Sequence, residues 1–155
     1  MTTNAVRQLK SAGISFSVRE YAVDENDLSG MHIAKELGID PDRMFKTLVT
    51  RGDKGNVTVF CIPTSRELAL KKCAAVTGEK KVEPVHVREL LSLTGYIRGG
   101  CSPIGMKKKY PTFIDETAVL WDTVFVSAGV RGTAVEIAPS DLIAFTGMTV
   151  KDVTK

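Results

Sequence analysis

The sequence predicts an α+β fold, with a mixed, largely antiparallel sheet that curls into a barrel-like core surrounded by short helices. Strand-like and helix-like segments are intermixed without the regular alternation of a doubly wound sheet. Two pairs of neighbouring strand-like segments are joined by glycine-containing turns, as in β-hairpins. A length of 155 residues fits one shared core, so we expect residues 1–155 to form a single domain.

The first 38 residues predict a helix, a strand and a second helix. Apolar residues at helical spacing between Asn4 and Gly13 indicate an amphipathic helix that Asn4 caps. β-Prone residues over 16–23 indicate a strand. After a polar connection, the apolar positions before Gly38 predict a short helix that this glycine ends.

The clearest hairpin signal covers residues 44–62. Two strand-like runs, 44–51 and 56–62, are joined by Gly52-Asp53-Lys54-Gly55, whose glycines suit a tight turn. Lys46 is the one lysine within the first, otherwise largely apolar run. Such a lysine either extends its ammonium to the edge of the sheet or points into a pocket.

Two helices and a short strand are expected in the middle of the chain. Thr64 and Glu67 have the spacing of a capping box, which predicts a helix that continues to Gly78. Residues 80–82 favour a short strand, and residues 85–93 favour a helix that ends before a glycine.

The last third predicts three strands and a closing helix. The β-prone runs are 113–115, 124–129 and 133–137, separated by turns. Pro139 is suited to the first position of a helix, which Gly147 ends.

Composition and charge exclude several classes of protein. No apolar run is long enough to span a membrane, and the N-terminus lacks the pattern of a secretory signal, so we expect a cytoplasmic protein. Three cysteines without a CxxC pair favour reduced thiols and no structural zinc site. His32 and His86 have no suitably spaced partner for a metal, and we expect no metal and no cofactor.

Basic residues cluster in the middle third, although the net charge is only +3. The cluster contains Lys71-Lys72, Lys80-Lys81, Arg98 and Lys107 to Lys109. These residues either contact phosphates of a nucleic acid or simply form solvated faces.

Residues 98–105 read Arg-Gly-Gly-Cys-Ser-Pro-Ile-Gly and are the strongest candidate for a functional loop. A tight connection between two elements is one interpretation, because glycine and proline mark turns in general. The other is a loop whose backbone N–H groups bind an anion or a developing oxyanion. Cys101 is a weak candidate nucleophile, since no histidine is positioned beside it in the sequence.

Three motifs occur in the order and at the spacing of one known family. They are Phe45-Lys46-Thr47-Leu48, the segment Gly99 to Gly105, and Ser127-Ala128-Gly129 followed by Arg131-Gly132 and Glu136 to Pro139. On these motifs the chain resembles YbaK-type proteins, bacterial deacylases of cysteinyl-tRNA mischarged on tRNA(Pro). This family is related to the editing domain of bacterial prolyl-tRNA synthetases, and the resemblance runs almost end to end.

The resemblance implies trans-editing: a free-standing enzyme that hydrolyses the aminoacyl ester at the 3′ end of mischarged tRNA. Lys46 would contact the terminal nucleotide, and the glycine loop would line the aminoacyl pocket. In the family the thiol of the substrate is proposed to attack its own ester, which makes a protein nucleophile unnecessary. Aminoacyl-tRNA and prolyl-tRNA synthetase are the expected partners.

The resulting candidate site has two parts. At the reacting ester we place Lys46, Gly100, Cys101 and Ser102. As substrate-binding residues we expect Tyr21, Phe45, Thr47, Arg98, Gly99, Pro103, Ile104, Gly105, Ser127 and Gly129.

Ala134 departs from the pattern of some relatives, which have a polar or acidic residue after the Arg-Gly turn. This departure favours the alternative hypothesis of a nucleotide-binding, RNA-binding or regulatory module that keeps the fold without the deacylase activity.

Overall fold

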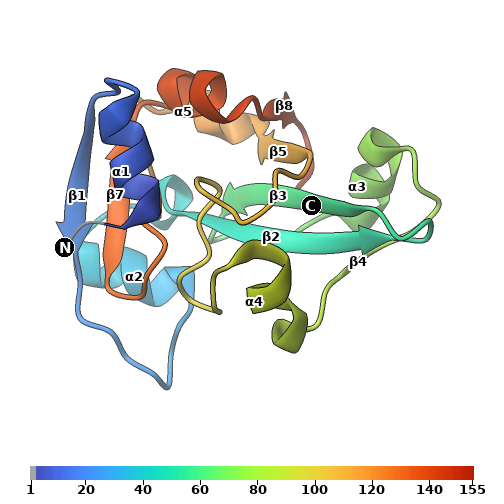
Figure 1. Ribbon diagram of the computed structural model, residues 1–155, viewed down its shortest axis with the longest axis horizontal. Helices are drawn as coiled ribbons and strands as arrows, with labels where there is room; N and C mark the ends of the chain where they lie inside the picture. Colours follow the sequence, from blue (N-terminus) through green and yellow to red (C-terminus); the bar gives the residue numbers. More distant parts are fainter. Residues whose placement is uncertain (1–2) are drawn as a thin grey trace.

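The computed structural model describes residues 3–155, in which short helices surround two β-sheets (Figure 1). The helices are α1 (Asn4–Ser11), α2 (Gly30–Leu37), α3 (Leu70–Thr77), α4 (Val87–Thr94), α5 (Pro139–Thr146) and the 3₁₀ helices η1 (Pro41–Arg43) and η2 (Glu116–Leu120). The strands are β1 (Phe16–Glu20), β2 (Phe45–Gly52), β3 (Val57–Pro63), β4 (Val82–Pro84), β5 (Thr112–Asp115), β6 (Val124–Ser127), β7 (Thr133–Ile137) and β8 (Thr149–Lys151).

The strands form a three-stranded sheet of order β1-β7-β6 and a five-stranded sheet of order β4-β2-β3-β5-β8. Both predicted hairpins, β2-β3 and β6-β7, are antiparallel. In the larger sheet, β5 lies parallel to both β3 and β8. The prediction of a mixed, largely antiparallel α+β fold is therefore confirmed.

The barrel-like sheet is not confirmed. Within residues 3–155 the strands divide into two sheets, with no closed barrel. An isolated bridge between Met44 and Phe125 connects β2 to the end of the smaller sheet. The start of β2 in the larger sheet thus lies against the β6-β7 hairpin of the smaller sheet. Residues from both sheets can therefore line one cavity.

Glycines end four helices as the sequence predicts. Gly38, Gly78, Gly95 and Gly147 all have positive φ and occupy the C-cap positions of α2 to α5. The predicted N-cap of α1 is wrong by one residue, because Thr3 caps the helix. The Thr3 hydroxyl accepts a hydrogen bond from the Val6 N–H at 3.1 Å and donates to the Ala128 carbonyl at 2.6 Å.

The predicted capping box at Thr64 and Glu67 is also wrong, because α3 begins only at Leu70. The Ala69 N–H instead donates to the Val153 carbonyl, and Leu68 forms a β-bridge with Thr154. Pairing with the C-terminal segment thus replaces the first predicted turn of the helix.

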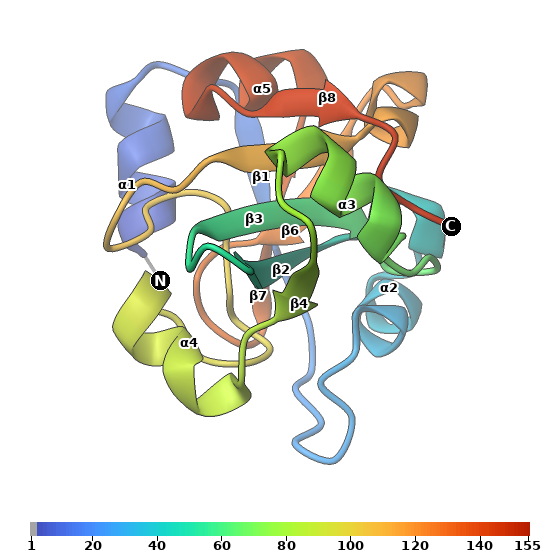
Figure 2. The same cartoon turned by 90° about the vertical axis from the view of Figure 1, so that its right-hand side faces the viewer.

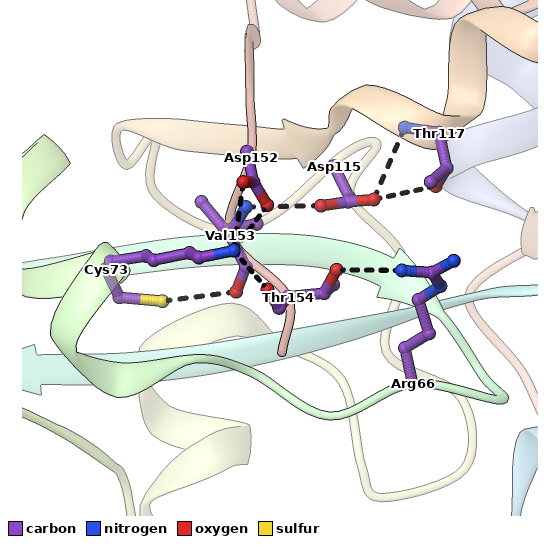
Figure 3. A network of polar contacts seen from close by, with 8 residues as sticks. Arg66, Cys73, Asp115, Thr117, Asp152, Val153 and Thr154 are labelled. Atoms are coloured by element: carbon purple, nitrogen blue, oxygen red, sulfur yellow. Dashed lines mark hydrogen bonds and ion pairs between the residues drawn. The ribbon is translucent and has the colours of Figure 1, made fainter.

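A polar network holds this C-terminal segment in place (Figure 3). Asp115 is fully buried and accepts hydrogen bonds from the Val153 N–H, at 3.1 Å, and from both the N–H and the hydroxyl of Thr117. Lys72 Nζ contacts Asp152 at 2.9 Å and the Thr154 carbonyl at 2.8 Å. The end of the chain is therefore fixed against the segment that follows β3.

Three apolar clusters form the core. The largest packs α1 and α5 against both sheets, the second lies between α3 and the larger sheet, and the third lies under α2. On one side of the molecule, α1, the segment around residues 98–110 and α4 lie next to one another in both views (Figures 1 and 2). In the described chain, every helix is too short or too polar to cross a lipid bilayer.

Candidate functional site

A cavity of about 360 Å³, which we call the main cavity, opens between β2, the start of α2 and α4. Four segments far apart in the sequence line it, together with Ser127 at the end of β6. The lining segments are Leu28 to Gly30 with Ile33, Met44 to Val49, Pro84 to Val87 with Leu90, and Arg98, Gly99 and Cys101. Its volume falls within the range of small-molecule sites, and most of its wall is apolar.

Lys46 is half-buried in this cavity wall. Its ammonium donates to the Thr64 carbonyl over a long distance of 3.4 Å. Burial lowers the pKa of Lys46, and the nearby Glu67 carboxylate offsets part of this effect. An ammonium has three donors, so this single long bond leaves donor capacity for a ligand in the cavity.

Phe45 and Thr47, the neighbours of Lys46 in β2, also line the main cavity. Phe45 is almost fully buried in the largest core cluster. The Thr47 hydroxyl lies 3.9 Å from the Cys61 sulfur on the paired strand. The strand that carries Lys46 is thus anchored on both sides of this lysine.

Gly30 fixes the start of α2 against the same region. A Cβ atom at Gly30 would lie 2.1 Å from the Thr64 hydroxyl oxygen, which is an impossible contact with that residue in place. Gly30, which lines the main cavity, therefore packs directly against Thr64, whose carbonyl accepts the hydrogen bond from Lys46.

The glycine loop enters the cavity as a tight turn. The Gly100 N–H donates to the Ile97 carbonyl at 3.0 Å, and Gly99 has a φ of 86°, which favours glycine. Arg131 Nε donates to the Arg98 carbonyl at 2.9 Å and ties the turn to the β6-β7 connection. Arg98, Gly99 and Cys101 face the main cavity, whereas the N–H of Gly100 is already used inside the turn.

The second half of the loop faces elsewhere. Ser102 is fully buried, and its hydroxyl accepts a hydrogen bond from the Ile104 N–H at 3.2 Å. Pro103, Ile104 and Gly105 line a second cavity of about 220 Å³. The first half of the loop thus lines the main cavity and the second half lines another. The sequence led us to expect one continuous wall of a single cavity.

Ser127, Gly129 and Tyr21 have different environments. Ser127 lines the main cavity, and its hydroxyl accepts from the Gly129 N–H at 3.1 Å. Gly129 lies outside the cavity, where a Cβ atom would come within 2.9 Å of the Tyr96 ring. Tyr21 lines a small adjoining cavity that shares Leu28, Ile33 and Gly99 with the main one. Burial raises the pKa of Tyr21.

Cys101 has the electrostatics of an unreactive thiol. Burial raises its pKa to about 11, and a hydrogen bond with Thr94 offsets only part of this effect. A thiol with this pKa is protonated near neutral pH, and nucleophilic cysteines act as thiolates. The position of Cys101 in the main cavity is therefore not accompanied by activation.

Ala134 lies behind the cavity wall. It is fully buried in the cluster that also contains Ile33 and Met44, and these two residues line the main cavity. A larger side chain at this position would first displace the wall, so Ala134 influences the site through its packing.

The sequence did not identify the contributions of α2 and α4. Gly30, Ile33, His86 and Leu90 line the main cavity only because these helices pack beside β2. No local pattern distinguishes them from other helix residues. Among residues 3–155, no cluster of His, Cys, Asp or Glu suited to a metal ion is present.

Comparison with known proteins gives consistent matches. The model of the aminoacyl-tRNA editing domain family matches residues 31–145. EbsC of Enterococcus faecalis, assigned as a Cys-tRNA(Pro)/Cys-tRNA(Cys) deacylase, is 45% identical over 152 residues, covering 98% of this chain and 93% of EbsC. YwhH of Bacillus subtilis, an uncharacterized protein, is 28% identical over 142 residues, covering 88% and 90% of the two chains.

Solved structures share the fold. One assigned as a trans-editing enzyme for prolyl-tRNA synthetase superposes with a TM-score of 0.85 at 24% identity, covering 100% of this chain and 99% of that one. The hypothetical protein APE2540 superposes with a TM-score of 0.90 at 22% identity, covering 99% and 100%. At these identities the superpositions establish the architecture alone.

Proposed function

The chain belongs to the aminoacyl-tRNA editing domain family, and we propose that it is a deacylase that hydrolyses mischarged tRNA, with cysteinyl-tRNA(Pro) as its main substrate. The family match over residues 31–145 and the 45% identity with EbsC support this activity. The observation that carries the proposal is the main cavity, in which the half-buried Lys46 and the Arg98–Cys101 turn are both present.

We assign the 3′ end of the tRNA to this cavity. Its volume of about 360 Å³ suits a small ligand, and the wall is apolar apart from a few polar groups. Lys46 would hold the terminal nucleotide through its ammonium. Arg98, Gly99 and Cys101 would border the ester, and Ser127 would contribute a hydroxyl beside it.

The remaining candidate residues do not line the main cavity, and we assign them a supporting role. Their hydrogen bonds and close contacts fix the glycine loop and Tyr96, and one of them lines the adjoining small cavity. These residues are Gly100, Ser102, Pro103, Ile104, Gly105, Gly129 and Tyr21.

The chemistry requires positioning more than a protein nucleophile. An aminoacyl ester is already activated, so holding the reacting atoms and stabilising the oxyanion supply much of the catalysis. We propose that the thiol of the bound cysteinyl group attacks its own carbonyl. A C–S bond forms and the ester C–O bond breaks, so the tRNA hydroxyl leaves with the thiol proton and a cysteine thiolactone remains. Water then opens the thiolactone to free cysteine, which completes the hydrolysis. The raised pKa of Cys101 supports this assignment over attack by the protein.

We further propose that residues 1–155 act as one editing domain in the cytoplasm, beside prolyl-tRNA synthetase, without a cofactor. The assignment of EbsC as a Cys-tRNA(Pro)/Cys-tRNA(Cys) deacylase supports a role in editing. It does not favour the alternative of an RNA-binding or regulatory module without activity.

The test is a deacylation assay with three substrates: cysteinyl-, alanyl- and prolyl-tRNA(Pro). We expect cysteinyl-tRNA(Pro) to have the highest kcat/KM. Alanyl- and prolyl-tRNA(Pro) lack the thiol that the proposed step requires, so little or no hydrolysis of either is expected. Absence of hydrolysis of all three substrates would contradict the proposed function.

A further inference from the structure

The second cavity lies directly behind the glycine loop. It is lined by Gln8 of α1, residues 103–106 and 108–110, Thr112 and the end of α5. Cys101 in the main cavity and Pro103 in the second are two residues apart, so their backbones are separated by at most about 7 Å. Figure 1 shows the yellow segment between α1 and α4, and Figure 2 places all three on the same side of the molecule.

The charged side chains that line the second cavity are basic. Lys108 and Lys109 line it, and no carboxylate does. Lys107 is exposed beside them. Arg7 is held nearby, because it donates to Asn4 Oδ1 at 2.8 Å and Asn4 in turn donates to the Gly105 carbonyl at 3.4 Å. In the part of the chain that the structure describes, the ion pairs do not involve the lysines at 107–109.

Another part of the lining of the main cavity has the reverse character. There, Pro84 to His86 are shared with a cavity of about 210 Å³ that Asp53, Glu83 and Glu89 also line. Its two basic side chains are already paired, Arg51 with Glu89 at 2.6 Å and Lys81 with Glu83 at 2.8 Å. A polyanion that leaves the main cavity in this direction would meet more carboxylates than free cations.

We propose that the second cavity binds backbone phosphates of the RNA whose 3′ end occupies the main cavity. The strand then leaves over the glycine loop toward α1, and not past Glu83 and Glu89. Exposed lysines without carboxylate partners supply the sequence-independent part of RNA affinity, which arises from counterion release. One loop thereby separates the reacting ester from the site that holds the rest of the strand. This inference rests on the proposed function.

The first test measures RNA binding without any reaction. An RNA hairpin that ends in CCA and carries no amino acid is titrated with the K108A/K109A variant at several salt concentrations, and binding is measured by fluorescence anisotropy. We expect Kd to rise on the order of tenfold at low salt, and the slope of log Kd against log salt to fall by about 2. The K108R/K109R variant, which keeps both charges, is expected to restore most of the affinity.

The matched control is K54A/K71A, which also removes two charges. Lys54 is exposed in the β2-β3 turn and Lys71 is exposed on α3. We expect its salt slope to equal that of the wild-type protein. Lys109 lies near the C-terminal end of α5, so thermal unfolding is measured for every variant. An unchanged salt slope in folded K108A/K109A would overturn the proposal, as would absence of hairpin binding by the wild-type protein.

The second test separates this inference from the proposed function. On cysteinyl-tRNA(Pro), K108A/K109A is expected to raise KM on the order of tenfold and to keep kcat. On the cysteinyl ester of adenosine, which has no phosphate, it is expected to match the wild-type protein. Equal losses on both substrates would mean that the lysines only support the main cavity. If the wild-type protein hydrolyses neither substrate, the proposed function is wrong. The salt dependence of hairpin binding would still show whether the second cavity binds phosphates.

Discussion

Lys46 and Asp115 are two ionisable groups in apolar surroundings, and they differ in how far the protein satisfies them. Asp115 is fully buried and accepts three hydrogen bonds, two from Thr117 and one from the Val153 N–H. Lys46 is half-buried beside a cavity of about 360 Å³ and makes one long bond to the Thr64 carbonyl. The completeness of hydrogen bonding, more than burial, therefore separates a structural group from one that can bind a ligand.

The physical basis is the cost of desolvating a charge. A buried polar group is stable when hydrogen bonds replace its water, as they do at Asp115. At Lys46 the replacement is incomplete, and burial accordingly lowers the pKa of this lysine. A phosphate or carbonyl oxygen entering the cavity would complete the set of acceptors. Sites that conflict with local stability in this way are where function is expected.

The largest expected effect comes from removing the unsatisfied group. Lys46→Ala is expected to lower kcat/KM for cysteinyl-tRNA(Pro) by about 10²–10³-fold, since it removes the cation that orients the substrate. The free energy of unfolding should change by less than about 1 kcal/mol, because the wild-type ammonium makes only one long hydrogen bond. Deacylation kinetics and urea denaturation measure the two effects.

The control for this variant is Lys54→Ala, which removes an exposed lysine from the turn of the same hairpin. It should retain wild-type kinetics. Full activity of Lys46→Ala would show that the incomplete hydrogen bonding of Lys46 has no role in substrate binding.

The second expected effect concerns Asp115, whose hydrogen bonds stabilise the fold. Asp115→Ala leaves the N–H groups of Val153 and Thr117 without their acceptor, and we expect a loss of about 3 kcal/mol in the free energy of unfolding. At a temperature where the variant remains folded, kcat/KM should fall less than tenfold. Urea denaturation and the deacylation assay, both at low temperature, measure these quantities.

Asp152 offers a matched control in the same segment. Its ion pair with Lys72 is about half exposed, with side-chain exposures of 49% and 44%. Asp152→Ala should therefore cost less than about 1 kcal/mol. Equal destabilisation by the two variants would show that hydrogen bonding at Asp115 is not what fixes the C-terminal segment.

Elements that depend on residues close in sequence were predicted, and elements that depend on distant partners were not. The β2-β3 hairpin and the glycine ends of α2 to α5 follow from residues close in sequence, and both were predicted correctly. Strand β8 was missed because it depends on parallel pairing with β5. The irregular segment before α3 was missed because it pairs with Val153 and Thr154. Local patterns do not encode such distant partners.

The candidate site was predictable to a similar extent. Lys46 and the turn Arg98–Cys101 were identified from motifs, and the structure brings them into one cavity. Their roles remain predictions. Gly30 was not identified, because its importance lies in the contact with Thr64, which only the packing of α2 creates. Pro103 to Gly105 were assigned to the same wall as Gly99, but the buried Ser102 turns the chain toward the second cavity.

The smallest effect is expected at Cys101, which lies in the main cavity and yet is not activated. Cys101→Ala should retain kcat/KM within about threefold, since the proposed nucleophile belongs to the substrate. With a pKa raised to about 11, about one thiol in a thousand is ionised at pH 8. Alkylation of the wild-type protein by iodoacetamide should therefore be slow at pH 8 and accelerate about tenfold per pH unit up to pH 10, as the thiolate fraction rises.

Mass spectrometry of the peptide that contains Cys101 measures this alkylation, and Cys101→Ser serves as the control of similar size in the deacylation assay. Complete loss of activity in both variants, together with rapid alkylation at pH 7, would identify Cys101 as a protein nucleophile. Retained activity would instead show that position in the cavity is not sufficient for a role in the chemistry. Lys46 differs from Cys101 because it is a charged group, and it differs from Asp115 because the protein leaves its hydrogen bonds incomplete.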